Sequence, residues 1–270
     1  MTQHSYRKRP TDNILMIRNR ITLFTLATLM ISSFAYAADM PSTGNQFSQS
    51  FSKAKKHNMK DVYYDHQVTL YCAASFDDKK AVTPPEGFET TKYRKRAKKI
   101  EWEHVVPAEN FGRNFKAWRD GHPECINKKG KKFKGRNCAG KVNTEYRYMQ
   151  ADMYNLYPAI GAVNASRSNY NFTLLPTADS DFGTCVMKIE SNKAEPPEGA
   201  RGRIARTYLY MEAAYSKYKM SKAQRKLMSA WDRMYPVDVW ECKRAQRIEA
   251  IQGNENAIVN QQCEKLSFWQ

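Results

Sequence analysis

The C-terminal third of the chain has apolar residues at helical spacing. From Gly202 onward they recur every three or four positions, the period that places side chains on one face of a helix. We therefore predict a run of helices, and we interpret the aromatic members as core rather than as a platform for stacked bases, because they keep this spacing strictly. The residues are Ile204, Tyr208, Met211, Tyr215, Tyr218, Leu227, Trp231, Met234, Trp240, Ile248 and Ile251.

Short strands are predicted ahead of this helical region. Residues 66–76 are rich in β-branched and aromatic side chains and indicate a strand that carries Cys72. A second strand should close at His104, because Pro107 lacks the N–H that a strand ladder needs. Segments 171–176 and 185–190 are typical of two further short strands.

Helices are predicted on either side of these strands. Residues 45–58 and 108–118 each indicate one helix, and another is expected from residue 144 to about 155. Pro158 is expected to be the first residue of the next helix, where its missing N–H would have no partner in any case. Strands in the middle with helices around them indicate an α+β fold.

Residues 1–37 have the pattern of a secretory signal peptide. Basic residues precede an uncharged apolar stretch, and Ala35 and Ala37 are small at the positions that a signal peptidase reads. An uncleaved membrane anchor is the alternative, but the apolar stretch is shorter than the roughly 20 residues of a spanning helix. Cleavage would leave residues 38–270, which suit a single soluble domain with one core.

The cysteines all follow the predicted signal peptide. Export would place them in an oxidising compartment, so we expect three disulfides. Many pairings are open to six cysteines, although a Cys125–Cys138 bridge would fasten the base of the loop between those two residues. A zinc site is less favoured, because no C-x-x-C pair is present. The six are Cys72, Cys125, Cys138, Cys185, Cys242 and Cys263.

The positive net charge of the chain indicates which class of binding partner to expect. The chain has 44 Lys and Arg against 27 Asp and Glu, a net charge of +17. Without residues 1–37 the counts are 39 and 26, so +13 remains on the exported part. A basic exported domain favours polyanions such as nucleic acid, anionic envelope polymers or membrane surfaces.

The stretch I-E-W-E-H-V-V-P, residues 100–107, holds candidate chemistry. On an extended strand Glu101 and Glu103 lie on one face and His104 on the other, so they converge only where the strand ends. Pro107 makes such an end plausible. The histidine could be a metal ligand, a general base, a nucleophile or a pH switch, or a buried histidine that bonds a backbone carbonyl.

A second polar group follows in N-L-Y-P-A-I-G-A-V-N-A-S-R, residues 155–167. Asn164 and Arg167 are three residues apart, so they are neighbours on one helix face. An asparagine oxygen beside a carboxylate suits Mg²⁺, which keeps several waters and completes its coordination with substrate phosphate. A helix C-terminal cap is the alternative use of Asn164.

These motifs together resemble a known family. I-E-W-E-H-V-V-P-A, G-R-N-C, A-D-M-Y-N-L-Y-P-A-I-G-A-V-N-A-S-R-S-N-Y and P-V-D-V-W-E-C-K-R-A-Q-R-I-E-A-I-Q-G-N are similar to the bacterial endonuclease I family of exported, non-specific nucleases, over about residues 45–265. The resemblance implies a disulfide-stabilised fold with a ββα-metal (His-Me finger) core surrounded by helices. It also implies cleavage of double- and single-stranded DNA, and of RNA, to 5′-phosphate ends.

The resemblance also implies a role for each matched residue. His104 matches the general base, and Glu103 and Asn164 match the ligands of one metal ion, Mg²⁺, for which Mn²⁺ or Ca²⁺ could substitute. Arg136 matches the arginine that holds the phosphate. Gln150 stands where the family leads us to expect glutamate.

The basic residues would then hold the substrate by its phosphates. We expect contacts from Arg167 and from the loop lysines Lys129, Lys132 and Lys134. The enzyme is expected to be periplasmic or secreted, and monomeric without an obligate protein partner.

Two other functions are open to the same chain. The first is a secreted protein that binds nucleic acid or other polyanions on this scaffold but has lost catalysis. The second is a cell-wall hydrolase that uses Glu101 and Glu103 as its paired carboxylates, although no aromatic groove for a sugar is evident nearby.

Overall fold

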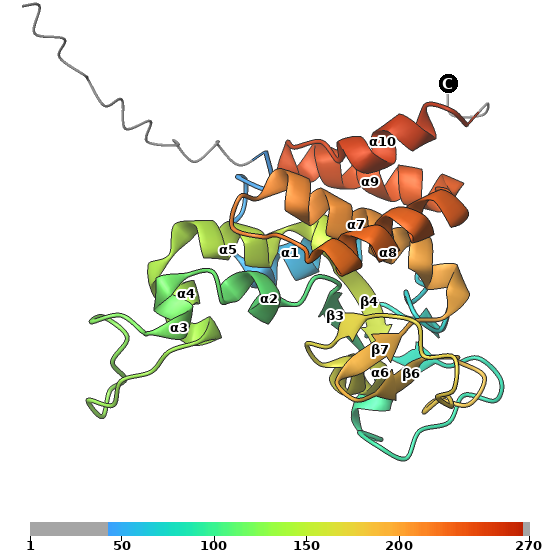
Figure 1. Ribbon diagram of the computed structural model, residues 1–270, viewed down its shortest axis with the longest axis horizontal. Coiled ribbons are helices and arrows are strands. Elements are labelled where there is room, and N and C mark those ends of the chain that lie inside the picture. Colours follow the sequence, from blue (N-terminus) through green and yellow to red (C-terminus); the bar gives the residue numbers. More distant parts are fainter. Residues whose placement is uncertain (1–42, 267–270) are drawn as a thin grey trace, which may run out of the picture. The chain divides into compact units, whose positions relative to one another are not determined.

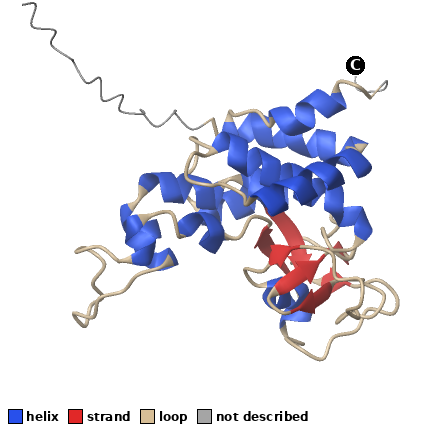
Figure 2. Cartoon of the chain, viewed as in Figure 1, coloured by secondary structure: helices blue, strands red, loops and turns tan. Residues whose placement is uncertain are grey.

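The computed structural model describes residues 43–266, in which helices predominate over short strands (Figures 1 and 2). The predicted signal peptide, residues 1–37, lies outside the described residues. No described helix is long and apolar enough to cross a membrane. The α-helices are α1 (Phe51–His57), α2 (Ala108–Gly112), α3 (Lys116–Arg119), α4 (Arg136–Val142), α5 (Thr144–Ala151), α6 (Gly161–Arg167), α7 (Arg201–Ala214), α8 (Lys222–Met234), α9 (Val239–Gln252) and α10 (Ala257–Cys263).

Shorter elements complete the described chain. A π-helical turn, η1 (Asn58–Val62), continues α1, and there are three 3₁₀ turns, η2 (Arg96–Lys98), η3 (Met153–Asn155) and η4 (Glu198–Ala200). The strands are β1 (Ser75–Phe76), β2 (Val82–Thr83), β3 (Ile100–His104), β4 (Leu156–Ile160), β5 (Asn171–Phe172), β6 (Lys188–Glu190) and β7 (Lys193–Glu195). Strand β7 lies between β5, to which it is parallel, and β6, to which it is antiparallel.

Strands β3 and β4 form the buried pair that carries the I-E-W-E-H motif. They are antiparallel, with Ile100 opposite Ile160 and His104 opposite Leu156. Helix α6 begins at Gly161, directly after β4. The order β3, β4, α6 is the predicted strand–strand–helix core, and the prediction of an α+β fold is confirmed.

The prediction that Pro158 begins a helix is wrong. This residue lies inside β4, opposite Trp102. Its carbonyl points to the outer edge of the strand, where it accepts a hydrogen bond from the backbone N–H of Leu70 at 2.8 Å. Proline is tolerated in a two-stranded pair because its missing N–H can face the edge that the partner strand does not use.

The prediction of a strand over 66–76 is also wrong for most of its length. Only Ser75 and Phe76 form a strand, β1, paired with β2. The residues before them make turns, and Ala73 has a left-handed φ of 49°. Cys72 is buried in this segment and bonded to Cys185, so packing and the disulfide override local β propensity.

The predicted helices are present but are shorter or divided. The helix expected over 45–58 begins only at Phe51, and the segment 108–118 is divided into α2 and α3 by a turn. The helix expected from residue 144 ends at Ala151 and is followed by η3. The strands expected within 171–176 and 185–190 are β5 and β6.

Four of the five C-terminal aromatics predicted as core are buried, whereas Trp240 is partly buried and its ring stacks on His66. Tyr208, Tyr215, Tyr218 and Trp231 are all at most 4% exposed. They join one hydrophobic cluster that also contains the β3–β4 pair. Such burial leaves these rings unable to stack on bases, so they stabilise the scaffold.

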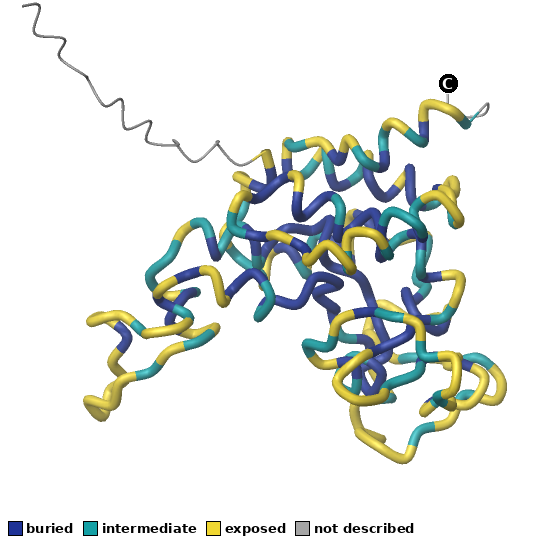
Figure 3. Tube along the Cα trace, viewed as in Figure 1, coloured by how far each residue is buried: buried dark blue, intermediate teal, exposed yellow. Residues whose placement is uncertain are grey.

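Disulfides close three segments of the described chain. The bonds are Cys72–Cys185, Cys125–Cys138 and Cys242–Cys263, and no described cysteine is free. The expected bridge at the base of the basic loop is therefore present. Figure 3 shows the loop between α3 and α4 as largely exposed.

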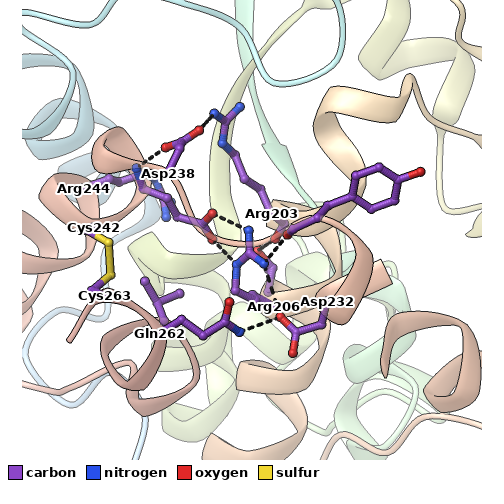
Figure 4. Close-up of polar contacts among 12 residues, drawn as sticks. Arg203, Arg206, Asp232, Asp238, Cys242, Arg244, Gln262 and Cys263 are labelled. Atoms are coloured by element: carbon purple, nitrogen blue, oxygen red, sulfur yellow. Dashed lines mark hydrogen bonds and ion pairs between the residues drawn. A yellow bond between two sulfur atoms is a disulfide. The ribbon is translucent and has the colours of Figure 1, made fainter. Parts of the chain in front are cut away.

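Ion pairs join α7 to α8 and α9 (Figure 4). Arg206 is buried, donates two hydrogen bonds to Glu241 at 2.7 and 2.5 Å, and contacts Asp232 at 3.2 Å. Asp238 is the N-cap of α9, because its side chain accepts from the Glu241 N–H at 2.7 Å, and it also pairs with Arg203. Burial raises the pKa of Asp238, but Arg203 and the cap hydrogen bond outweigh it and hold the pKa below its usual value.

We predict that Asp238→Ala lowers the free energy of unfolding at pH 7 by about 1 kcal/mol, the usual cost of a lost N-cap. A depressed folded-state pKa means that the carboxylate stabilises the fold above its unfolded pKa of about 3.9, and that this contribution disappears as the pH falls through the folded-state pKa. Urea unfolding from pH 7 to pH 3 measures the difference from wild type, which should shrink on acidification. Asp238→Asn also lacks the charge but keeps a cap, so its difference from wild type should have the same pH dependence and a smaller loss at pH 7. A loss at pH 7 as large as that of Asp238→Ala would contradict the capping role.

Candidate active site

A cleft of about 630 Å³ opens beside β3. The prediction that Glu101, Glu103 and His104 converge where the strand ends agrees with this structure, since all three line the cleft. Asn164 from α6 and Arg136 from α4 also line it. Further lining comes from Phe51, Lys55, Lys80, Arg96, Ile100, Trp102, Pro107, Ala108, Glu109, Trp118, Ser168 and Asn169.

His104 is held by one backbone hydrogen bond. Its Nε2 lies 2.9 Å from the carbonyl oxygen of Gln150, at the end of α5. A carbonyl can only accept, so Nε2 carries the proton and Nδ1 keeps its lone pair. Because the partner is a backbone atom, this bond does not require the glutamate expected at position 150.

The surroundings of His104 keep it neutral. The side chain is 7% exposed and the ring of Phe51 lies 4.9 Å away, centroid to centroid. Burial lowers its pKa to about 3, with a further contribution from the charge of Arg136. The neutral imidazole is the form that can accept a proton.

Glu103 is fixed by two hydrogen bonds on the same oxygen. Its Oε1 accepts from the Tyr71 hydroxyl at 2.7 Å and from Nη1 of Arg167 at 2.6 Å. Burial raises the pKa of this carboxyl, and Arg167 and Tyr71 oppose that rise. Neither hydrogen bond uses Oε2, which leaves one carboxylate oxygen for another ligand.

Arg167 does not lie where a substrate contact requires it. The side chain is 0% exposed, and besides Glu103 it donates to the carbonyl oxygens of His104 at 2.9 Å and Val105 at 2.6 Å. Its guanidinium also lies 4.4 Å from the ring centroid of Phe172. Arg167 therefore joins α6 to the end of β3. Its guanidinium is not accessible to a substrate phosphate, so the predicted substrate contact is wrong.

Oxygen donors in the cleft fit a hard divalent cation. Among the described residues there is no cluster of three His, Cys, Asp or Glu side chains that could hold a metal ion. Glu103 and Asn164 offer one carboxylate and one amide oxygen, a small set that suits Mg²⁺ because this ion keeps waters and binds substrate phosphate. The residues present therefore fit such an ion.

The predicted loop lysines lie away from this cleft. Lys132 and Lys134 line a second cavity of about 670 Å³, together with His122 and Phe133, and Lys129 is exposed on the same loop. Lys55, Lys80 and Arg96 line the first cleft. No motif marked Lys55 or Lys80, because their segments meet β3 only in the folded chain.

Comparison with known proteins shows the family to which the chain belongs. The Endonuclease I family model matches residues 36–263. An extracellular deoxyribonuclease of Aeromonas hydrophila is 40% identical over 224 residues, 80% of this chain and 92% of the relative. A periplasmic deoxyribonuclease of the same organism is 40% identical over 81% of this chain and 89% of its own length. An Endonuclease-1 of Buchnera aphidicola subsp. Acyrthosiphon pisum (strain APS) is 36% identical over 80% of this chain and 83% of its own length.

The chain belongs to the endonuclease I family. The predicted resemblance is thereby confirmed over nearly the whole of the described chain, and with it the prediction that the protein is an endonuclease.

We predict that Arg167→Met lowers the free energy of unfolding by about 3–5 kcal/mol, because it leaves the carboxylate of Glu103 buried without its partner. Urea denaturation at pH 7 measures the loss. The double variant Glu103→Gln/Arg167→Met should recover part of it, since no charge then remains buried alone. A double variant less stable than Arg167→Met would show that the pair is not the source of the loss.

Proposed function

We propose that the protein is an exported, metal-dependent endonuclease without sequence preference that hydrolyses phosphodiester bonds of DNA and RNA to 5′-phosphate ends. The observation that carries the proposal is the single cleft lined by His104, Glu103, Asn164 and Arg136. The names of the Aeromonas hydrophila relatives, extracellular and periplasmic deoxyribonucleases, support both the substrate and the export. Residues 1–37 would be the signal peptide, and residues 38–270 a single domain, periplasmic or secreted.

His104 would act as the general base. Its Nδ1 is the ring nitrogen left free by the bond to Gln150, so it can accept a proton from the water that attacks phosphorus. The hydrogen bond at Nε2 keeps the ring oriented while the proton moves. An anionic phosphate in the cleft raises the pKa of the imidazole from its low value and so favours this transfer.

Glu103 and Asn164 would hold one metal ion, Mg²⁺, with Mn²⁺ or Ca²⁺ as possible substitutes. When bound there, the ion supplies charge neutralisation at the scissile phosphate and stabilises the leaving 3′ oxygen. Glu103 would contribute Oε2, since Oε1 already accepts from Tyr71 and Arg167. The fixed Oε1 keeps the carboxylate from rotating.

Arg136 would hold the phosphate. It is the first residue of α4, is exposed, and lines the cleft that contains His104. A guanidinium matches a phosphate with two parallel N–H donors, which a lysine cannot provide. Lys55, Lys80 and Arg96 add positive charge to the same cleft.

Contacts beyond the cleft would be made to phosphates rather than to bases, because base-edge contacts would impose sequence preference. Lys129, Lys132 and Lys134 are exposed on the loop closed by the Cys125–Cys138 bond, and they are the contacts we propose there. Double- and single-stranded substrates share this phosphate chemistry. The enzyme would act as a monomer without an obligate protein partner.

We predict that His104→Ala lowers the rate of plasmid nicking about 10²–10⁴-fold, the usual contribution of a general base. Binding of the plasmid, measured by gel shift in Ca²⁺, should change little, because His104 is 7% exposed and offers little surface to DNA. Addition of EDTA should abolish nicking by the wild-type protein.

The matched control is His122→Ala, which changes an exposed histidine of the second cavity and should nick at the wild-type rate. Wild-type protein that shifts the plasmid without nicking it in Mg²⁺ or Mn²⁺ would instead establish a nucleic-acid-binding protein that has lost catalysis. Cleavage of peptidoglycan but not of plasmid would establish the cell-wall hydrolase.

We predict that replacing Lys129, Lys132 and Lys134 together by alanine weakens binding equally for unrelated sequences. The slope of log K against log [salt] should fall by about 1 for each lysine that contacts phosphate. Gel shifts from 50 to 200 mM salt measure the slope, and replacement of Lys219, Lys222 and Lys226, the last two on α8, provides the charge-matched control. An equal loss of slope in both triple variants would contradict a specific role for the loop.

A further inference from the structure

Glu101 lies between an arginine and the proposed metal-binding asparagine. Its Oε1 accepts from Nε of Arg96 at 2.7 Å, and its Oε2 accepts from Nη2 of Arg96 at 2.5 Å and from Nδ2 of Asn164 at 2.7 Å. The side chain is one-third exposed, and all three residues line the cleft. Every hydrogen bond found for this carboxylate therefore goes to one of two partners.

The bond to Glu101 determines which end of the Asn164 amide faces it. A carboxylate only accepts, so the amide must present its NH₂ group, and its Oδ1 is the end left free. A divalent cation binds the oxygen of an amide and not its NH₂. Resting on the proposed function of Asn164 as a metal ligand, we infer that Glu101 is a positioning residue that keeps the Asn164 oxygen oriented for a divalent metal ion.

Arg96 fixes the orientation of the Glu101 carboxylate. It forms two hydrogen bonds with the carboxylate, one to each oxygen, and the fork geometry fixes the plane of the carboxylate. Glu103 differs, because its two hydrogen bonds both use Oε1. The two glutamates of the E-W-E motif thus have separate tasks, one as ligand and the other as the group that orients a ligand.

Gly161 supplies a second observation. An added Cβ at this first residue of α6 would lie 2.6 Å from the Arg96 carbonyl oxygen and 3.0 Å from Oε1 of Glu101. The start of α6 therefore packs directly against the Arg96–Glu101 pair, and only glycine fits. Asn164 stands three residues later in the same short helix, so this close approach brings its amide to the carboxylate.

Binding of Mn²⁺ to the oxidised protein tests the inference without relying on activity. Electron paramagnetic resonance of free Mn²⁺ gives the Kd for wild type, Glu101→Ala and Glu101→Gln. Glu101→Ala should weaken binding about 10–100-fold, the usual effect of losing a group that orients a metal ligand. Glu101→Gln should bind nearly as wild type, because its amide oxygen can still accept from Asn164.

A charge-matched control distinguishes orientation of the Asn164 oxygen from electrostatic attraction between a carboxylate and the metal ion. Glu109→Ala removes a carboxylate that also lines the cleft and is equally exposed, at 33%. It should change the Kd for Mn²⁺ far less than Glu101→Ala does. In an Asn164→Ala background, Glu101→Ala should add little further loss, because the group that it orients is already absent.

The outcomes distinguish the inference from the proposed function. Equal weakening by Glu101→Ala and Glu101→Gln would overturn the inference, since loss of charge alone would then explain the effect. Wild-type affinity in Glu101→Ala, with weak binding in Asn164→Ala, would overturn the inference and leave the proposed metal site standing. A wild-type protein that binds no Mn²⁺ would overturn both.

Discussion

The buried ion pair of Glu103 and Arg167 is the interaction on which the rest of the site depends. It joins the end of β3 to the end of α6, two segments separated by 64 positions in the sequence. Arg167 also donates to the carbonyl oxygens of His104, the last residue of β3, and of Val105, the residue after it. Burying such a pair costs free energy of desolvation, and these additional hydrogen bonds offset it. His104 and the proposed metal ligand Glu103 are thereby held together at the end of β3.

A second buried arginine supports this corner from the helical side. Arg244 of α9 donates to the carbonyl oxygens of Met153 at 2.7 Å and Leu156 at 3.1 Å, and to the hydroxyl of Tyr157 at 2.9 Å. These acceptors lie in η3 and at the start of β4, the strand that pairs with β3. The C-terminal helices, predicted as a separate pattern in the sequence, therefore position β4 through specific hydrogen bonds as well as through apolar packing.

Local patterns and motif resemblance predicted much of this arrangement, and tertiary contacts account for what they missed. The strand that ends at His104 follows from Pro107, and the C-terminal helices follow from their spacing. Pro158 was wrongly predicted to begin a helix. Its place in β4 depends on a hydrogen bond from the backbone N–H of Leu70 to its carbonyl, a tertiary contact that no local sequence pattern indicates. The prediction that Arg167 contacts substrate was wrong for a similar reason. A basic residue beside a proposed metal-binding motif suggests phosphate contact, but the end of β3 supplies the acceptors that hold this side chain fully buried.

Tyr71 links the Glu103 carboxylate to a disulfide of the protein. It donates to Oε1 of Glu103, and the next residue along the chain is Cys72, which is bonded to Cys185. Disulfides form and persist in oxidising compartments and are rare where thiols are kept reduced. The segment that carries this tyrosine has almost no strand structure of its own, so its anchor is a bond that the cytoplasm does not supply. The hydrogen bond from Tyr71 to Glu103 thus depends on a neighbouring disulfide, and this disulfide forms in an oxidising compartment.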